Sequence, residues 1–283
     1  MAQGDSPTNG PHQGAWVDTP EGENWFFHFQ DRGPFGRVVH LQPMVWKNDW
    51  PIIGIDANND GCGEPVLEYT KPNIAGNHPI TTPPESDSFD SNRIGLQWQW
   101  HANPMDWWYY ANIDAEKLYL YSVTQPEDFI NLWDIPNLLL QKLPSNNFTA
   151  TAKLTFKPLD ANIGERAGLV VMGMDYAMIS IEKSEDSYVL SQIECKDADK
   201  KGNEIVKEST IINDSTFYLR VKVSPSSSCV FSYSLDGNNF TQLGDEFISK
   251  EGKWIGAKIG FFCSRPSSTN DGGRIEIDWF KVD

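Results

Sequence analysis

The sequence predicts an all-β protein in which a small group of strands precedes a larger two-sheet β-sandwich. Apolar and polar residues alternate in many short segments, a pattern typical of half-buried strands. No segment has a convincing helical period, and clusters of Gly, Pro, Asn and Asp separate the apolar segments. With 283 residues the chain is long enough for two domains.

Four short strands are expected in residues 1–70. Residues 16–17 and 25–29 are the first two, and residues 38–41 and 50–55 form a β-hairpin around the turn at 47–49. A four-stranded unit of this kind is the content of one propeller blade, which needs neighbours to bury its faces. Such a unit either packs on the sandwich or belongs to a longer protein.

The rest of the chain predicts a linker and a sandwich. Residues 71–85 contain four prolines and no apolar period, as expected for a linker. Residues 148–156, 217–223 and 274–282 alternate with period two, and about a dozen such strands argue for a two-sheet sandwich over residues 86–283. Residues 132–143 are compatible with a helix interrupted by Pro136 or with an inner strand.

The net charge and the cysteine spacing disfavour several classes of function. The formal net charge of −16 at pH 7 disfavours nucleic acid or an anionic membrane as a partner. Residues 1–10 lack the basic and apolar regions of a signal peptide. The four cysteines have no metal-binding spacing, and Cys229 and Cys263 are expected to be small core residues.

A series of short motifs resembles the end of the catalytic domain of glycoside hydrolase family 43. In order, they are His12-Gln13-Gly14, Phe29-Gln30-Asp31, Gly36-Arg37, His40-Leu41-Gln42-Pro43, and Trp50-Pro51 with Gly54. Residues 94–104 (IGLQWQWHANP) resemble the concanavalin A-like β-sandwich that follows the propeller in one branch of the family. The resemblance implies that residues 1–70 are an incomplete β-propeller remnant, the C-terminal end of a five-bladed β-propeller glycosidase domain. It also implies that residues 86–283 are a concanavalin A-like (jelly-roll) sandwich.

The resemblance implies a hydrolase of xylan or arabinoxylan oligosaccharides, either a β-xylosidase or an α-L-arabinofuranosidase. Such hydrolysis usually needs two carboxylates, and those of the family lie in blades that precede the matching region. No catalytic residue is therefore assigned here, and the chain alone is expected to be inactive. The expected partners are a plant cell-wall oligosaccharide and the missing propeller blades. The location of the parent protein is left open. The alternative is a carbohydrate-binding or structural sandwich without catalysis.

Arg37 and His12 are the substrate-binding candidates that the resemblance implies. Arg37 matches the arginine that reaches into the sugar site, where a planar guanidinium can hold two hydroxyls at once. Otherwise it is a surface arginine at the end of a strand. His12 matches a histidine near the propeller axis, where members hold calcium or water, so it is also a candidate metal ligand. Otherwise it is solvated in a loop.

Trp98 and Trp100 are the sugar-binding candidates of the sandwich. They lie two residues apart and so share one face of a strand, in a segment that also contains Trp107 and Trp108. If they are exposed, they form a platform for sugar rings. If they are buried, they belong to the core, which large aromatic side chains usually dominate.

Calcium is the expected structural cofactor. Asp87 and Asp90 lie near the first strand of the sandwich, and Asp278 lies in the last. Concanavalin-like modules often tie these termini with calcium, which prefers carboxylate and carbonyl oxygen ligands. The three aspartates are therefore candidate ligands.

Overall fold

The computed structural model describes residues 1–8, 13–185 and 187–283, which form two compact units, residues 1–82 and residues 83–283. Strands dominate both units, and helical structure in the described residues is limited to short 3₁₀ turns. The predicted all-β class is confirmed. Within the described part, no helix has the length and apolar character needed to span a bilayer.

The first unit contains a four-stranded antiparallel sheet whose strands follow chain order. Its strands are β1 (Gly14–Asp18), β2 (Asn24–Asp31), β3 (Arg37–Lys47) and β4 (Trp50–Ile53), with the 3₁₀ turn η1 (Gly33–Phe35) before β3. Asn48 and Asp49 join β3 to β4 with φ of 52° and 61°, a left-handed conformation that Asn and Asp tolerate in tight hairpin turns. The predicted hairpin is therefore present.

Strand β3 is longer than the sequence predicts. The Gln-Pro step at Pro43 marks the end of the expected strand, because proline cannot donate to a ladder. The strand nevertheless continues to Lys47. The carbonyl of Pro43 accepts a 2.8 Å hydrogen bond from the Gly54 amide.

One face of this sheet carries apolar side chains that remain exposed. The strand register places Val17, Phe27, Val39, Leu41 and Val45 on the same face. Their exposed fractions range from 37% for Leu41 to 64% for Val39. Burial of apolar surface stabilises a fold by roughly 25 cal/mol per Å². Covering this face, which we call the open face, would therefore stabilise the first unit.

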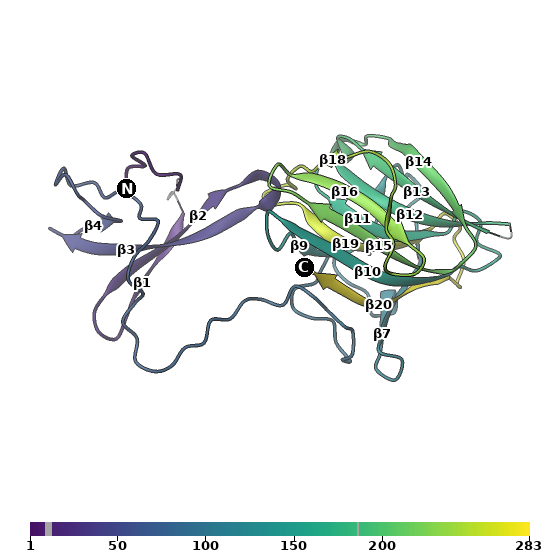
Figure 1. The fold of residues 1–283 in the computed structure, drawn as a ribbon, viewed down its shortest axis with the longest axis horizontal. Coiled ribbons are helices and arrows are strands. Elements are labelled where there is room, and N and C mark those ends of the chain that lie inside the picture. Colours follow the sequence, from purple (N-terminus) through teal and green to yellow (C-terminus); the bar gives the residue numbers. More distant parts are fainter. Residues whose placement is uncertain (9–12, 186) are drawn as a thin grey trace. The chain divides into compact units, whose positions relative to one another are not determined.

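The second unit is a sandwich of two sheets (Figure 1). The first sheet contains β6 (Tyr109–Asn112), β7 (Lys117–Tyr121), β10 (Phe148–Lys157), β15 (Thr216–Val223), β16 (Ser228–Ser234), β17 (Thr241–Gln242), β18 (Phe247–Ile248) and β20 (Arg274–Val282). Its order is β17-β16-β15-β10-β20-β7-β6, with β18 paired to β16. The predicted strands at 148–156, 217–223 and 274–282 are confirmed as β10, β15 and β20.

The second sheet lies across the core from the first. It contains β5 (Gln99–Trp100), β8 (Val123–Thr124), β9 (Leu139–Lys142), β11 (Arg166–Met172), β12 (Tyr176–Ser184), β13 (Ser187–Cys195), β14 (Glu204–Ile212) and β19 (Lys258–Arg265). Its order is β14-β13-β12-β11-β19-β9-β5, with β8 parallel to β19. Cys229 and Cys263 are buried and free, as expected for core residues.

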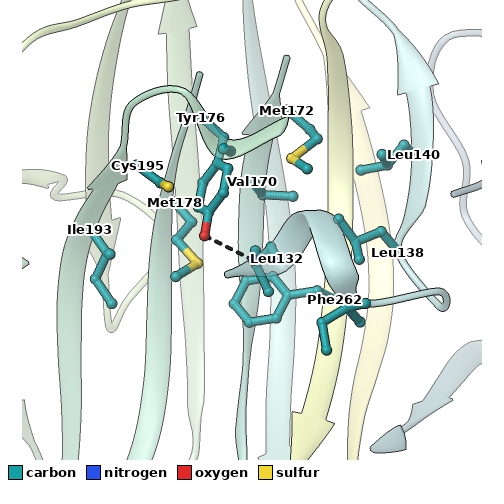
Figure 2. Close-up of a cluster of buried hydrophobic side chains, with 12 residues drawn as sticks. Leu132, Leu138, Leu140, Val170, Met172, Tyr176, Met178, Ile193, Cys195 and Phe262 are labelled. Carbon is teal, nitrogen blue, oxygen red and sulfur yellow. Dashed lines mark hydrogen bonds between the residues drawn. The ribbon is translucent and has the colours of Figure 1, made fainter. Parts of the chain in front are cut away.

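Strands β11 and β12 are buried on both faces, unlike the alternating strands of the first sheet. Leu169 and Ile179 pair on one face, and Val170 and Met178 pair on the other. The second face carries its own apolar cluster (Figure 2). This arrangement explains why β11 and most of β12 read as continuous apolar runs.

The segment 126–138 covers this second apolar face. Its 3₁₀ turn η3 (Leu132–Asp134) places Leu132 among Tyr176, Met178 and Phe262 (Figure 2). Ile135 and Leu138 complete the contact, and both are fully buried. The ambiguous segment 132–143 is therefore neither a helix nor one strand, but η3 followed by β9.

Candidate functional site

Arg37 is the first residue of β3, and it lies on the open face of the sheet. The register pairs Arg37 with Asp31 and Val39 with Phe29, so Arg37 and Phe29 share that face. The Arg37 guanidinium carbon lies 4.7 Å from the centroid of the Phe29 ring, within cation–π range. Arg37 itself is exposed at the start of β3.

Two histidines face each other in the middle of the same sheet. His28 on β2 pairs with His40 on β3, and their ring centroids are 5.3 Å apart. Both ring nitrogens of His28 and Nε2 of His40 are buried without a hydrogen-bond partner among the described residues. Burial lowers the pKa of both imidazoles; at His28 the backbone of Phe29 opposes this effect and the charge of His40 adds to it.

Sequence reasoning did not single out this histidine pair. The signal available in the sequence is that β2 and β3 pair through the short connection 32–36, which brings His28 opposite His40. The predicted site residue His12 lies outside the described residues, so its role as a substrate or metal ligand stays a prediction.

The four tryptophans of the segment 98–108 have different surroundings. Trp98 is buried and packs in the core, with its ring centroid 5.3 Å from that of Phe280. Trp100 is half-buried and packs 5.5 Å from Trp108, which is buried. Trp107 is 59% exposed. The surroundings of Trp98 and Trp100 favour the core interpretation over the sugar platform. The exposed ring is that of Trp107, seven residues after Trp100.

The three candidate calcium ligands have other partners. Asp278 accepts a 2.9 Å hydrogen bond from the Lys153 ammonium, and Lys117 lies 3.4 Å away. The pKa of Lys153 is raised mainly by its hydrogen bond to Asp278. Two ammonium groups at one carboxylate compete directly with a cation, so the surroundings of Asp278 do not fit calcium.

The other two aspartates accept hydrogen bonds from other groups of the sandwich. Asp87 accepts from the Phe89 amide and from the Trp98 indole, both at 2.9 Å, and Asp90 accepts from Ser88 at 3.0 Å. Among the residues that the structure describes, no group of three His, Cys, Asp or Glu side chains could hold a metal ion. Calcium therefore stays a prediction, and the geometry does not favour it.

Comparison with known proteins identifies the family of the sandwich. Residues 86–283 match the family model described as the beta-xylosidase C-terminal concanavalin A-like domain. A Formosa agariphila protein named β-xylosidase is 32% identical over 96% of this chain and 47% of its own length. A Xylanibacter ruminicola protein provisionally named a β-xylosidase is 34% identical over 92% of this chain and 46% of its own length. The chain thus spans about half the length of the curated relatives it matches.

Solved structures share the fold across nearly the whole chain. A crystal structure titled as a xylan β-1,4-xylosidase from Bacillus halodurans superimposes with a TM-score of 0.77 at 21% identity. It covers 95% of this chain and 52% of that protein. A family 43 glycoside hydrolase from Bacillus licheniformis gives the same TM-score at 21% identity and covers 100% of this chain and 55% of that protein.

Proposed function

This chain belongs to the family of β-xylosidase C-terminal concanavalin A-like domains, and on that basis we propose a function for it. It is the C-terminal part of a family 43-like glycoside hydrolase that cleaves O-glycosyl bonds of xylan or arabinoxylan oligosaccharides. The observation that carries the proposal is the family match over residues 86–283, together with relatives about twice as long that bear β-xylosidase names.

The open face supports the proposal for the first unit. A four-stranded sheet with five exposed apolar side chains on one face has the form of a propeller blade that lacks a neighbour. We propose that the preceding blades of a longer protein cover this face and supply the catalytic carboxylates. Arg37 then contributes a guanidinium to the sugar site from the exposed start of β3.

A fusion protein tests this function. The 283-residue chain is joined behind the part of the Formosa agariphila relative that it does not cover, and is assayed on aryl β-xylosides and α-L-arabinofuranosides. We expect the chain alone to give no turnover and the fusion to hydrolyse at least one substrate. Arg37→Ala in the fusion should lower kcat/KM about 10- to 100-fold, because a charge-assisted hydrogen bond contributes roughly 1.5–3 kcal/mol.

The control is Arg93→Ala, which removes an exposed arginine of the second unit and should leave kcat/KM unchanged. The proposal fails if the chain alone turns over at ordinary enzyme rates. It also fails if a folded fusion hydrolyses neither substrate. Equal activity of Arg37→Ala and wild type would remove Arg37 from the site.

The alternative is a sandwich that binds carbohydrate without catalysis. One observation favours a binding role beside the catalytic one, namely the exposed Trp107, which lines a pocket of the second unit. The two roles are compatible in one protein, since the pocket belongs entirely to residues 107–272.

A further inference from the structure

A pocket of about 660 Å³ lies where several strands of the first sheet end together. Strand β6 pairs with β7, β7 with β20, and β20 with β10. The pairing continues past the strand ends, since the Ser122 amide donates a 2.9 Å hydrogen bond to the Gly273 carbonyl. Consequently the segment before β6, the end of β7, the segment before β20 and the segment after β10 meet at one edge. Trp107, Tyr121, Asp271 and Leu159 come from these four segments in that order.

Aromatic and polar side chains share the lining of this pocket. Trp107 is 59% exposed and stands edge-to-face on the buried Trp108, with ring centroids 6.2 Å apart. Tyr121 adds a second ring. The side chains of Asn270 and Asp271 are exposed, and among the described residues neither has a hydrogen-bond or ion-pair partner. An amide and a carboxylate beside aromatic rings are the groups that hold hydroxyl-rich ligands.

The segment that carries Asn270 and Asp271 is fixed from below by buried polar groups. Arg265 is 6% exposed, and each of its three nitrogens donates a hydrogen bond within the protein, to Ser122 or Thr269. Asn162, also buried, donates to the Asp271 carbonyl at 3.1 Å. The lining is therefore preformed, which lowers the entropic cost of binding.

Buried Glu165 supports the same edge. It is 1% exposed and accepts hydrogen bonds from the Ser122 hydroxyl and from the amides of Leu159 and Gly273, the last two at 2.7 Å. A carboxylate with all these donors is a structural group and is not available to a ligand. Gly272 completes the fit, because a Cβ there would lie 2.6 Å from Arg265 Nη1 and 2.7 Å from Ser122 Oγ.

We propose that this pocket is a carbohydrate-binding subsite that takes a neutral oligosaccharide. A sugar ring packs on Trp107 through its C–H face, and its hydroxyls donate to Asp271 and exchange hydrogen bonds with Asn270. Anionic ligands are disfavoured, because each nitrogen of buried Arg265 already donates within the protein and the exposed charged group on the lining is the Asp271 carboxylate. The choice of xylo-oligosaccharides as the ligand rests on the proposed function.

The test is a binding titration of the full 283-residue chain with xylohexaose, followed by tryptophan fluorescence and calorimetry. We expect saturable binding, and Trp107→Ala should weaken it at least about tenfold, since loss of a large aromatic contact removes more than about 1.4 kcal/mol. Asp271→Ala should also weaken binding. Tyr110→Ala is the matched control, because Tyr110 is 53% exposed on β6 but does not line the pocket. It should bind as wild type does.

The melting temperatures of all three variants should equal that of wild type, since the replaced side chains are exposed. Absence of saturable binding to the folded chain would overturn the subsite. So would unchanged affinity in both Trp107→Ala and Asp271→Ala. Binding of cellohexaose but not xylohexaose, lost in Trp107→Ala, would support the subsite and contradict the proposed xylan substrate. Hydrolysis by the fusion protein is a separate measurement, so the two proposals can fail independently.

Discussion

His28 is a buried imidazole whose two nitrogens have no hydrogen-bond partner among the described residues. An unsatisfied buried polar group costs stability, and a charged one costs more. His40 lies directly across the strand pair, so protonation of both rings would place two positive charges about 5.3 Å apart, measured between ring centroids. The neutral form of both side chains is therefore the one that the fold accommodates.

The stability of the first unit should consequently depend on pH. The pKa of His28 and of His40 is lowered in the folded state from the usual 6.5, so the unfolded chain binds more protons over the interval below 6.5. Stability present above 6.5 is lost as the pH falls through the folded-state values. Amide hydrogen exchange of β2 and β3 should show less protection at about pH 5.5 than at about pH 7.5, after correction for intrinsic rates.

Two variants identify the groups responsible. His28→Phe should reduce this pH dependence, whereas His78→Gln, which replaces an exposed histidine of the same unit, should leave it intact. Equal protection of the wild-type strands at both pH values would show that the histidine pair does not contribute.

At the scale of elements, a hydrogen-bond network around Tyr176 helps to hold segment 126–138 on the second sheet. The Leu132 amide donates to the Tyr176 hydroxyl at 2.9 Å, and that hydroxyl donates to Glu204. Glu204 also receives two hydrogen bonds from Arg166, at 2.6 and 3.0 Å. Burial and the neighbouring carboxylate of Glu204 raise the pKa of Tyr176, so its hydroxyl remains protonated.

Tyr176→Phe should lower the free energy of unfolding of the sandwich by about 1–3 kcal/mol, because it leaves the buried Leu132 amide without an acceptor. Leu132→Ala should cost about 2–5 kcal/mol, since it creates a cavity beneath the segment. Both values follow from urea denaturation. Tyr110→Phe, on an exposed ring, is the control and should change stability little. A Tyr176→Phe value near zero would show that the network is not needed to hold the segment.

The sequence predicts elements well where the signal is local. Residues 217–223 alternate apolar and polar side chains, and this period alone defines β15 and its inner face. The hairpin turn is likewise predicted from two adjacent residues, Asn48 and Asp49. The covered face of β11 and β12 is different, because the segment that covers it, at 126–138, is distant in sequence and has no periodicity. Such a long-range contact has no local signature.

The candidate sites also combine features with a local sequence signal and features that depend on distant contacts. The crowding of tryptophans at 98–108 indicates an aromatic feature, but which ring is exposed depends on η2 (Asp106–Trp108), a 3₁₀ turn that changes the period of the side chains. Trp98 is therefore core and Trp107 is surface. From the sequence alone, Asp278 is a candidate calcium ligand. The lysines that neutralise it come from β10 and β7, more than a hundred residues away in the chain, so the sequence near Asp278 gives no sign of them.

At the scale of the whole molecule, the two units have different means of stabilisation. The sandwich has a fully buried core between its sheets and a second apolar layer at Leu132. The first unit has one sheet with an open face, and no named strand lies between Ile53 and Gln99 in the described chain. Local opening should therefore cost less free energy in the first unit than in the second.

Limited proteolysis should show this difference. We expect the first cleavages within residues 1–82 and a resistant fragment that starts near residue 86. Added xylose should not protect the first unit, because Arg37 alone does not form a complete sugar site. Hydrogen exchange in β3 as slow as in β10 would instead show that both units unfold together, and the interpretation of residues 1–70 as an incomplete domain would be withdrawn.

The pocket at Trp107 separates the groups that meet solvent from the groups that hold the loop. The side chains of Asn270 and Asp271 make no hydrogen bond or ion pair within the described protein, whereas Asn162, Arg265 and Glu165 hold the backbone of Asp271, Thr269 and Gly273 in place. Substitutions at positions 270 and 271 therefore change the chemistry of the rim without disturbing the fold. Such an arrangement lets the ligand preference of related proteins change quickly during evolution. It also makes these two positions suitable for randomisation in a library selected for new glycan specificity.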